Sequence, residues 1–136
     1  METTFKNLKI KSEFQGGKAA PWNNNSLPTN YNHHVITVTN MDDDTSASFD
    51  FWASQMRPEI QSENDLLGAL DCFLSDAISG EMDLNEFYRE FYYGTDDIEE
   101  ATKTHKACQK AFENALYVIG DTETIYSMAN EIRELV

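Results

Sequence analysis

Carboxylates are the most abundant side chains in this sequence that could do chemistry. The chain has 136 residues, with 24 Asp and Glu against 10 Lys and Arg, which gives a net charge of −14. Positions 1–61 hold seven acids and five bases, whereas positions 62–136 hold seventeen acids and five bases. Pairs of carboxylates can act as general acid and base, but acids this frequent do not mark any one pair as catalytic. Nearly all of the net negative charge is therefore expected on the second part of the chain.

The densest run of acids, at positions 76–100, also contains aromatic residues. One interpretation is a solvated surface that aids solubility. The other is a surface that meets a basic partner, with carboxylates held on helices where phosphates would otherwise bind. The candidate contacts of such a surface are Asp83, Glu86, Glu90, Tyr92, Asp96, Asp97, Glu99 and Glu100.

Five aromatic residues lie within seven positions of this run. Phe87 and Phe91 are four residues apart, which places them on one face of a helix, so we expect both in the core. One helix face cannot bury all five rings, and Tyr88, Tyr92 or Tyr93 is expected to stay exposed among the acids. Tyrosine is favoured in protein interfaces, although packing over a sheet edge is the alternative interpretation.

Residue types that commonly bind metals are present, but their spacing is wrong for a shared site. His33 and His34 are adjacent in a predicted strand, where neighbouring side chains point to opposite faces. The three acids at 42–44 fall in a predicted turn and are not expected to converge on one cation. Cys72 and Cys108 each lie beside apolar residues in predicted helices, so both are interpreted as core residues. We therefore expect no metal ion and no cofactor.

Catalytic motifs are absent from the sequence. It has no nucleophile elbow, phosphate-binding glycine loop, Cys–His pair or zincin motif, so we expect no catalytic residue and no enzyme activity. The net charge argues against direct binding to nucleic acid and against docking on anionic membranes. No apolar run approaches the roughly 20 residues that span a bilayer, and residues 1–11 lack the apolar core of a signal peptide. The expected location is the cytosol.

Alternating apolar residues and turn residues predict strands in the first part of the chain. The pattern at 8–14 is typical of a half-buried strand that Gly16 and Gly17 interrupt, and 18–32 has the composition of a long loop. β-Branched residues predict a second strand at 33–39, and alternation predicts a third at 46–53. A turn at 40–45 joins them into a hairpin.

Capping residues and apolar stripes predict four helices in the second part. Ser62 and Asp65 resemble a capping box before a helix that runs to about 78 and ends at Gly80. Asp83 and Glu86 open a short helix through 91. A third helix is predicted from about 96 to 119, with Ile98 and His105 on its apolar stripe, and Asp121 caps the last one.

The fold class that follows is α+β. We expect one domain over 1–136, with a strand-rich part at 1–61 and an acidic helical part at 62–136. The predicted architecture is a small three-stranded antiparallel sheet with about four helices packed on one face.

Several segments resemble small acidic accessory proteins of phages and mobile elements. They are residues 35–38, 49–52 and 67–77, extended by 87–93 and by the helix that contains Cys108, so that the resemblance covers about residues 31–116. Several small acidic phage proteins of other sequence inhibit host defence, among them anti-CRISPR and antirestriction proteins. The resemblance implies that biological setting and transfers no catalytic residue.

Charge and resemblance together predict a phage-type inhibitor of a host defence system. Its expected partner is a nucleic-acid-binding defence protein, such as a CRISPR effector, whose DNA or RNA site the acidic surface would block. The alternative is an accessory module that binds another protein through apolar and tyrosine contacts without mimicking nucleic acid. A homodimer is compatible with either interpretation if its interface avoids the acidic surface.

Overall fold

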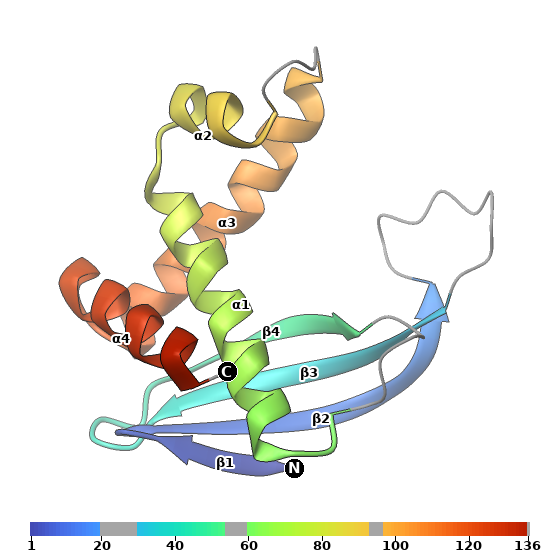
Figure 1. Cartoon of the computed structure of the whole chain (residues 1–136), viewed down its shortest axis with the longest axis vertical. Coiled ribbons are helices and arrows are strands. Elements are labelled where there is room, and N and C mark those ends of the chain that lie inside the picture. The colour runs from blue at the N-terminus through green and yellow to red at the C-terminus, as the bar shows by residue number, and fades with distance from the viewer. Residues whose placement is uncertain (20–29, 54–59, 93–96, 136) are drawn as a thin grey trace. The chain divides into compact units, whose positions relative to one another are not determined.

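The structure is a computed structural model that describes residues 1–19, 30–53, 60–92 and 97–135. It contains a four-stranded antiparallel sheet and four helices, which confirms the α+β class (Figure 1). The chain forms two compact units, Met1–Leu70, which we call the sheet unit, and Asp71–Val136, which we call the helical unit. The predicted packing of helices on one sheet face stays a prediction.

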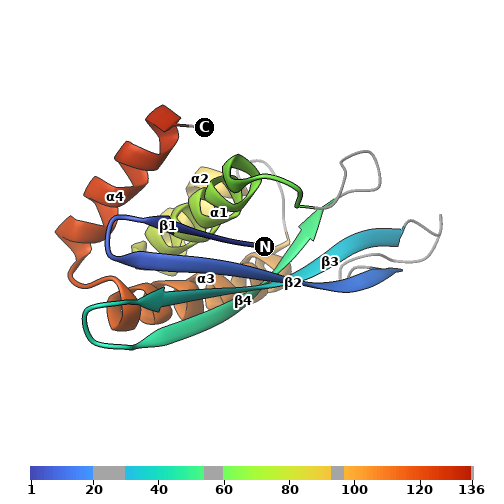
Figure 2. The same cartoon turned by 90° about the horizontal axis from the view of Figure 1, so that it is seen from below.

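Four strands, not three, make up the sheet in the sequential order β1-β2-β3-β4. Figure 2 shows them side by side, with β2 and β3 continuing beyond β1. The strands are β1 (Glu2–Phe5), β2 (Leu8–Ala19), β3 (Asn30–Asn40) and β4 (Ser46–Ala53).

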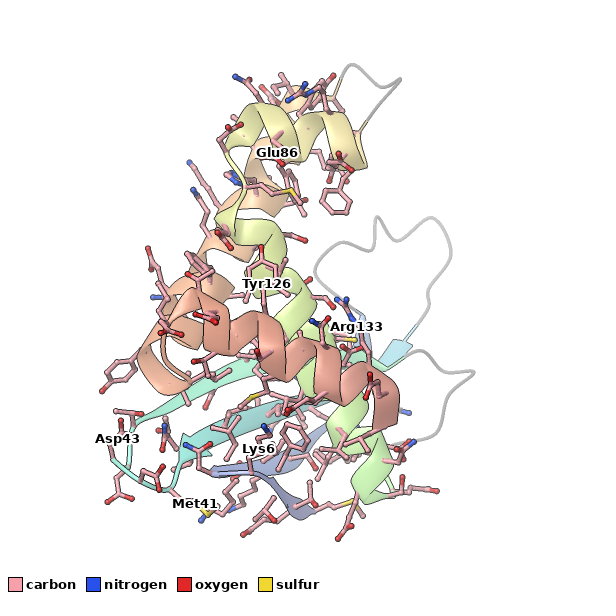
Figure 3. The ribbon with its side chains drawn as sticks, turned by 60° about the vertical axis from the view of Figure 1, so that its left-hand side comes forward. Lys6, Met41, Asp43, Glu86, Tyr126 and Arg133 are labelled. Atoms are coloured by element: carbon pink, nitrogen blue, oxygen red, sulfur yellow. The ribbon has the colours of Figure 1, made fainter. Side chains whose placement is uncertain are left out.

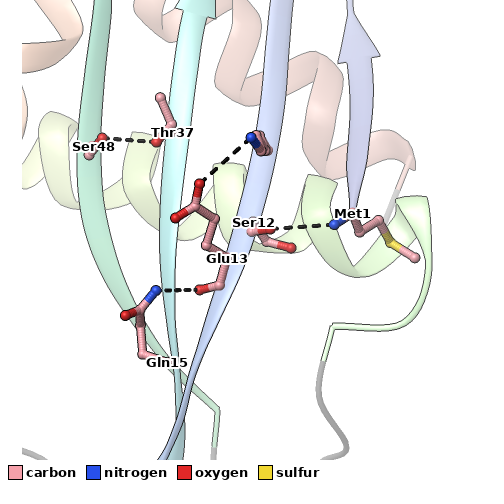
Figure 4. Close-up of polar contacts among 7 residues, drawn as sticks. Met1, Ser12, Glu13, Gln15, Thr37 and Ser48 are labelled. Atoms are coloured by element: carbon pink, nitrogen blue, oxygen red, sulfur yellow. Dashed lines mark hydrogen bonds and ion pairs between the residues drawn. The ribbon is translucent and has the colours of Figure 1, made fainter.

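Strand β1 was missed because four residues are too few to show an alternating pattern. Its turn to β2 also lacks glycine, and Lys6 adopts the left-handed backbone conformation there with φ 54°. Pairing with β2 stabilises the strand, with Thr3 opposite Ile10. The Ser12 amide donates to the Met1 carbonyl at 2.8 Å, and the Met1 amino group lies 3.3 Å from the Ser12 carbonyl (Figure 4).

Strands β2 and β3 are longer than predicted. The two glycines do not end β2, because the chain forms a bulge between Phe14 and Gly16 and then continues to Ala19. Gly16 has φ 102°, which only glycine adopts readily. The predicted loop is shorter as a result, since β3 already begins at Asn30, and residues 20–29 lie outside the described residues.

One face of the sheet carries the buried apolar residues. Leu8, Ile10 and Ile36 have no exposed surface, and Val38 is 1% exposed. Ile10 lies opposite Val38, which lies opposite Ala47, so the register aligns these side chains in one row across three strands. The period-two pattern of the sequence is confirmed here. On the other face, Thr37 Oγ1 and Ser48 Oγ are 2.9 Å apart (Figure 4).

The acidic turn between β3 and β4 is held by its own side chains. The Asn40 carboxamide oxygen accepts a hydrogen bond from the Asp42 amide at 2.9 Å. Asp43 accepts from the Thr45 amide at 3.0 Å and from its hydroxyl at 2.7 Å. These bonds to the hydroxyl and the amide of Thr45 lower the pKa of Asp43. Asp44 takes the left-handed conformation with φ 61°, so the three acids have local roles in the turn.

The helices begin close to the positions that the capping residues predicted. Ser62 and Asp65 bond reciprocally, since the Asp65 amide donates to Ser62 Oγ and the Ser62 amide donates to Asp65 Oδ2, both at 3.1 Å. Asp121 accepts from the Thr124 amide at 2.9 Å. None of the described helices is long and apolar enough to span a membrane. The helices are α1 (Glu63–Glu81), α2 (Leu84–Phe91), α3 (Ile98–Val118) and α4 (Thr122–Leu135).

The sequence predicted that Gly80 ends α1, and this prediction was wrong. Gly80 lies inside α1, where α1 meets α3 within the helical unit. A Cβ atom at this position would overlap the backbone carbonyl of Cys108 and lie 2.7 Å from the amide nitrogen of Gln109. Gly80 is buried. The two helices therefore approach each other backbone to backbone, which only glycine permits.

Gly80→Ala is expected to destabilise the protein by about 1–3 kcal/mol, because the added methyl group forces α1 and α3 apart. Gly68→Ala in the same helix is the matched control, since a Cβ there meets nothing within 4 Å. That variant should gain about 0.5–1 kcal/mol from helix propensity. Urea unfolding followed by circular dichroism measures both, and equal stability of the two variants would contradict the close approach.

Candidate functional site

The acidic residues of α2 and α3 begin with two helix caps. Asp83 Oδ1 accepts from the Glu86 amide at 2.8 Å, and Asp97 Oδ1 accepts from the Glu100 amide at 3.0 Å. Carboxylates in a first turn are also favoured by the helix dipole. Part of the acid density in this region therefore has a local cause, the start of two consecutive helices.

An aromatic cluster holds α2 against α3. Phe87 is 2% exposed, and its ring centroid lies 4.9 Å from that of Phe91 and 5.0 Å from that of His105. His105 is buried, as predicted, with Nε2 at 2.6 Å from the Met82 carbonyl oxygen. Figure 1 shows α2 lying across the first half of α3. The two acidic segments therefore belong to the same end of the helical unit.

Six of the eight predicted contact residues are exposed in the structure. Tyr92 is half-buried, and its hydroxyl bonds Thr104 Oγ1 at 3.0 Å, so it links the end of α2 to α3. Asp96 and Tyr93 lie outside the described residues. We define the acidic surface by its exposed carboxylates, which are Asp83, Glu86, Glu90, Asp97, Glu99 and Glu100.

Phe91, which was predicted in the core, and Ile98, which was predicted on an apolar stripe, are both exposed beside these acids. Phe91 is 55% exposed and Ile98 is 48% exposed. Phe91 is the last residue of α2 and Ile98 is the first of α3, so each lies at a helix end, while Phe87 fills the contact between the helices. Helical periodicity identified the apolar stripes of α2 and α3. It did not identify the positions at which the contact between the two helices ends.

Tyr126 of α4 interacts with carboxylates of α1 and α2. Burial raises the pKa of the Tyr126 phenol, and so do its hydrogen bond to Glu81 and the charges of Glu81 and Glu86. Figure 3 shows Tyr126 and Glu86 on the helical unit. The phenol donates to the Glu81 carboxylate and so adds a hydrogen bond between α4 and the end of α1. The sequence carried no signal for this contact.

Basic residues of α3 border the acidic surface. Lys103 and Lys106 are exposed, and with Ile98, Glu99 and Thr102 they line a shallow depression. Three and four residues separate neighbouring positions on one helix face, so Glu99 lies next to Lys103. The surface is therefore acidic on α2 and at the start of α3, and mixed in charge farther along α3.

His33, a possible metal ligand by residue type, makes contacts with neighbouring side chains of the sheet. His33 Nε2 lies 2.8 Å from Asp50 Oδ1, and the imidazole stacks on Trp52 with centroids 4.0 Å apart. Among residues 1–19, 30–53, 60–92 and 97–135, no three His, Cys, Asp or Glu side chains are grouped as a metal ion would require.

The two cysteines differ in exposure. Cys108 is buried, as predicted, whereas Cys72 is exposed, so the prediction of a core position was wrong for Cys72. Burial and the charge of Asp76 raise the pKa of Cys108 to about 11. Burial likewise raises the pKa of the Asp76 carboxyl, although the residue as a whole is exposed.

No protein-family model matches this sequence, and no curated protein is significantly similar to it.

Asp83→Ala and Asp97→Ala are each expected to cost about 1 kcal/mol of stability, because a helix amide loses its acceptor. Asp83→Asn and Asp97→Asn keep an acceptor oxygen and should cost much less, although they remove the same charge. Urea unfolding followed by circular dichroism distinguishes the two kinds of variant. A similar loss for Ala and Asn would show that charge, and not capping, stabilises these helix starts.

A thiol reagent at mildly alkaline pH is expected to modify Cys72 in the folded protein, and Cys108 only after unfolding. Thiolate is the reactive form, and the raised pKa of Cys108 keeps this buried thiol protonated. Cys72→Ser should leave the folded protein almost unreactive. Rapid modification of Cys108 in that variant would contradict its burial.

Proposed function

We propose that the protein is a non-enzymatic inhibitor that binds a host defence protein through its acidic surface. The target in this proposal is a nucleic-acid-binding protein, such as a CRISPR effector, and the bound inhibitor blocks access of DNA or RNA. The observation that supports it is the exposure of six carboxylates at one end of the helical unit, beside exposed Phe91 and Ile98. The proposed setting is the cytosol of a phage-infected host cell.

Charge and apolar surface have different roles in this proposal. The helical unit carries fifteen acids and five bases, a net charge of −10, which would speed encounter with a basic partner. Charge alone gives little affinity, because exposed ion pairs are worth about 0–1 kcal/mol each. Phe91 and Ile98 supply apolar area of the kind that anchors interfaces. A solubilising surface would need carboxylates but not these two side chains.

Lys103 and Lys106 favour a second candidate, a protein-interaction module that does not mimic nucleic acid. A channel that binds DNA or RNA is lined mainly by positive charge, so it would repel these exposed lysines where they face that charge. A protein surface of mixed charge would not. In the first candidate the α2 side of the acidic surface enters the channel, and in the second the partner also contacts the depression on α3.

Charge reversal on the acidic surface is expected to weaken partner binding. The variant combines Glu86→Lys, Glu90→Lys and Glu99→Lys, and the matched control combines Glu63→Lys, Glu123→Lys and Glu134→Lys. Each set has two residues in a first helical turn and one outside, so helix-dipole effects and total charge change equally. Thermal unfolding of both variants checks that neither is unfolded.

Binding is measured by affinity capture from nuclease-treated host lysate, followed by titration of the captured protein after purification. We expect the charge-reversed variant to bind at least about tenfold more weakly, a loss of about 1.4 kcal/mol, and the control to bind like the wild type. Equal weakening by both variants would remove the acidic surface from the proposal.

Competition with nucleic acid separates the two candidates. An inhibitor that blocks the channel should displace bound DNA or RNA from the captured protein, with an affinity that falls steeply as salt rises. Binding without displacement, little changed by salt and weakened by Lys103→Glu with Lys106→Glu, would support the interaction module instead.

A further inference from the structure

Strand β4 forms an edge of the sheet, and the two edges differ. At one edge, β1 has four residues and pairs with Leu8–Lys11 of β2. At the other edge, β4 has eight residues, and its ladder runs to β3 alone from Ser46 to Ala53. A long edge strand presents unpaired amide and carbonyl groups that can pair with another strand.

The pattern of hydrogen bonds identifies which groups of β4 point outward. The Asn40 amide donates to the Thr45 carbonyl at 2.8 Å, so this opposite pair is hydrogen-bonded. Hydrogen-bonded and non-hydrogen-bonded pairs alternate along an antiparallel ladder. Phe49 therefore bonds inward to β3, whereas the amides and carbonyls of Ser48 and Asp50 point away from β3. Within the described residues, no backbone hydrogen bond outside the β3 ladder reaches Ser48 or Asp50.

Most of the usual protections of an edge strand are missing from β4. Such strands commonly carry lysine, proline or a bulge. Positions 46–53 have no lysine and no proline, and the register with β3 is regular throughout. Asp50 is the one charged residue on the strand, and its carboxylate bonds His33 at 2.8 Å. Nothing on the strand itself prevents another strand from pairing there.

We infer that β4 pairs antiparallel with the β4 strand of a second copy of this chain, in a register centred on Phe49. In this register the backbone groups of Ser48 bond those of Asp50 in the other copy, and the reverse. The Ser48 hydroxyl of one copy then faces the Asp50 carboxylate of the other. Each Asp50 therefore lies opposite a hydrogen-bond donor, and not opposite the Asp50 of the second copy. Ala47 lies opposite Phe51, which continues the apolar row formed by Ile10, Val38 and Ala47.

Charge opposes a second copy less at this edge than on the helical unit. The sheet unit carries nine acids and five bases, a net charge of −4, against −10 on the helical unit. Two copies that meet through β4 therefore use the less acidic part of the chain. This inference does not depend on the proposed function, because the acidic surface belongs to the other unit.

Ser48→Pro tests the pairing without breaking the ladder inside the chain. Proline is tolerated on an edge strand where its nitrogen faces solvent, and it removes the amide that a neighbouring strand needs. Ser48→Ala is the matched control, because it loses the same hydroxyl contact with Thr37 but keeps the amide. Sedimentation velocity over a wide concentration range is expected to show dimers for the wild type and Ser48→Ala. Ser48→Pro should dimerise about a hundredfold more weakly, with an unchanged circular dichroism spectrum.

Cross-linking gives a second readout that does not require proline to be tolerated. In the inferred register Phe49 faces Phe49 of the other copy in a non-hydrogen-bonded pair, where Cα atoms lie about 4.5 Å apart, close enough for a disulfide. Phe49→Cys in a Cys72→Ser background should form a covalent dimer under mild oxidation, and Ala47→Cys should not.

Three results would overturn the inference. The first is a monomeric wild type at every concentration, which would leave the edge to a strand of another protein. The second is undiminished dimerisation of a folded Ser48→Pro variant. The third is equal cross-linking of Ala47→Cys and Phe49→Cys, which would indicate random collision.

Discussion

The close backbone contact between Gly80 of α1 and Cys108 of α3 is the constraint on which the helical unit depends. Because no side chain separates the helices there, α1 can run one residue past Gly80 and the chain can turn directly into α2. The Met82 carbonyl then meets the imidazole of His105, and Phe87 fills the contact between α2 and α3. This local geometry places both acidic segments at one end of the unit.

Carboxylates in this region both cap helices and form the exposed acidic surface. The N-caps Asp83 and Asp97 each accept a hydrogen bond from a helix amide, and both side chains stay exposed. Glu86, Glu90 and Glu99 do not cap a helix with their side chains, so their substitution is the more informative test of the proposed binding. Exposed Phe91 and Ile98 beside them distinguish this surface from an evenly solvated acidic face, while Lys103 and Lys106 limit its extent along α3.

The two units divide charge and hydrogen-bonding potential between them. The helical unit carries most of the net charge and satisfies its backbone internally, as helices do. The sheet unit carries less net charge, and β4 lies at the edge of its sheet. Within the described residues, no neighbouring strand bonds the outward backbone groups of β4. A dimer formed through β4 would display two acidic surfaces, and a partner with two basic sites would then bind with higher avidity.

Local patterns in the sequence were sufficient for features that depend on neighbouring residues. β-Branched residues at 33–39 and alternation at 46–53 predicted a hairpin, and Ser62, Asp83 and Asp121 predicted helix starts. These features were predictable because strand faces and caps involve residues only a few positions apart. Exposure of the six predicted acids that the structure describes also followed from their charge, since unpaired carboxylates are costly to bury.

Tertiary structure alone decided the features that depend on distant partners. Strand β1 exists because β2 pairs with it, and Gly16 forms a bulge because β3 holds both sides of it in register. Gly80 continues a helix because the Cys108 backbone lies where a side chain would be, although glycine by itself usually signals a helix end. Phe91 is exposed because α2 ends at that residue, and periodicity does not reveal where a packing partner stops. The sequence by itself thus determined the types of elements, their caps and the uneven charge, whereas contacts between residues far apart in the chain decided the strand count and which apolar residues remain at the surface.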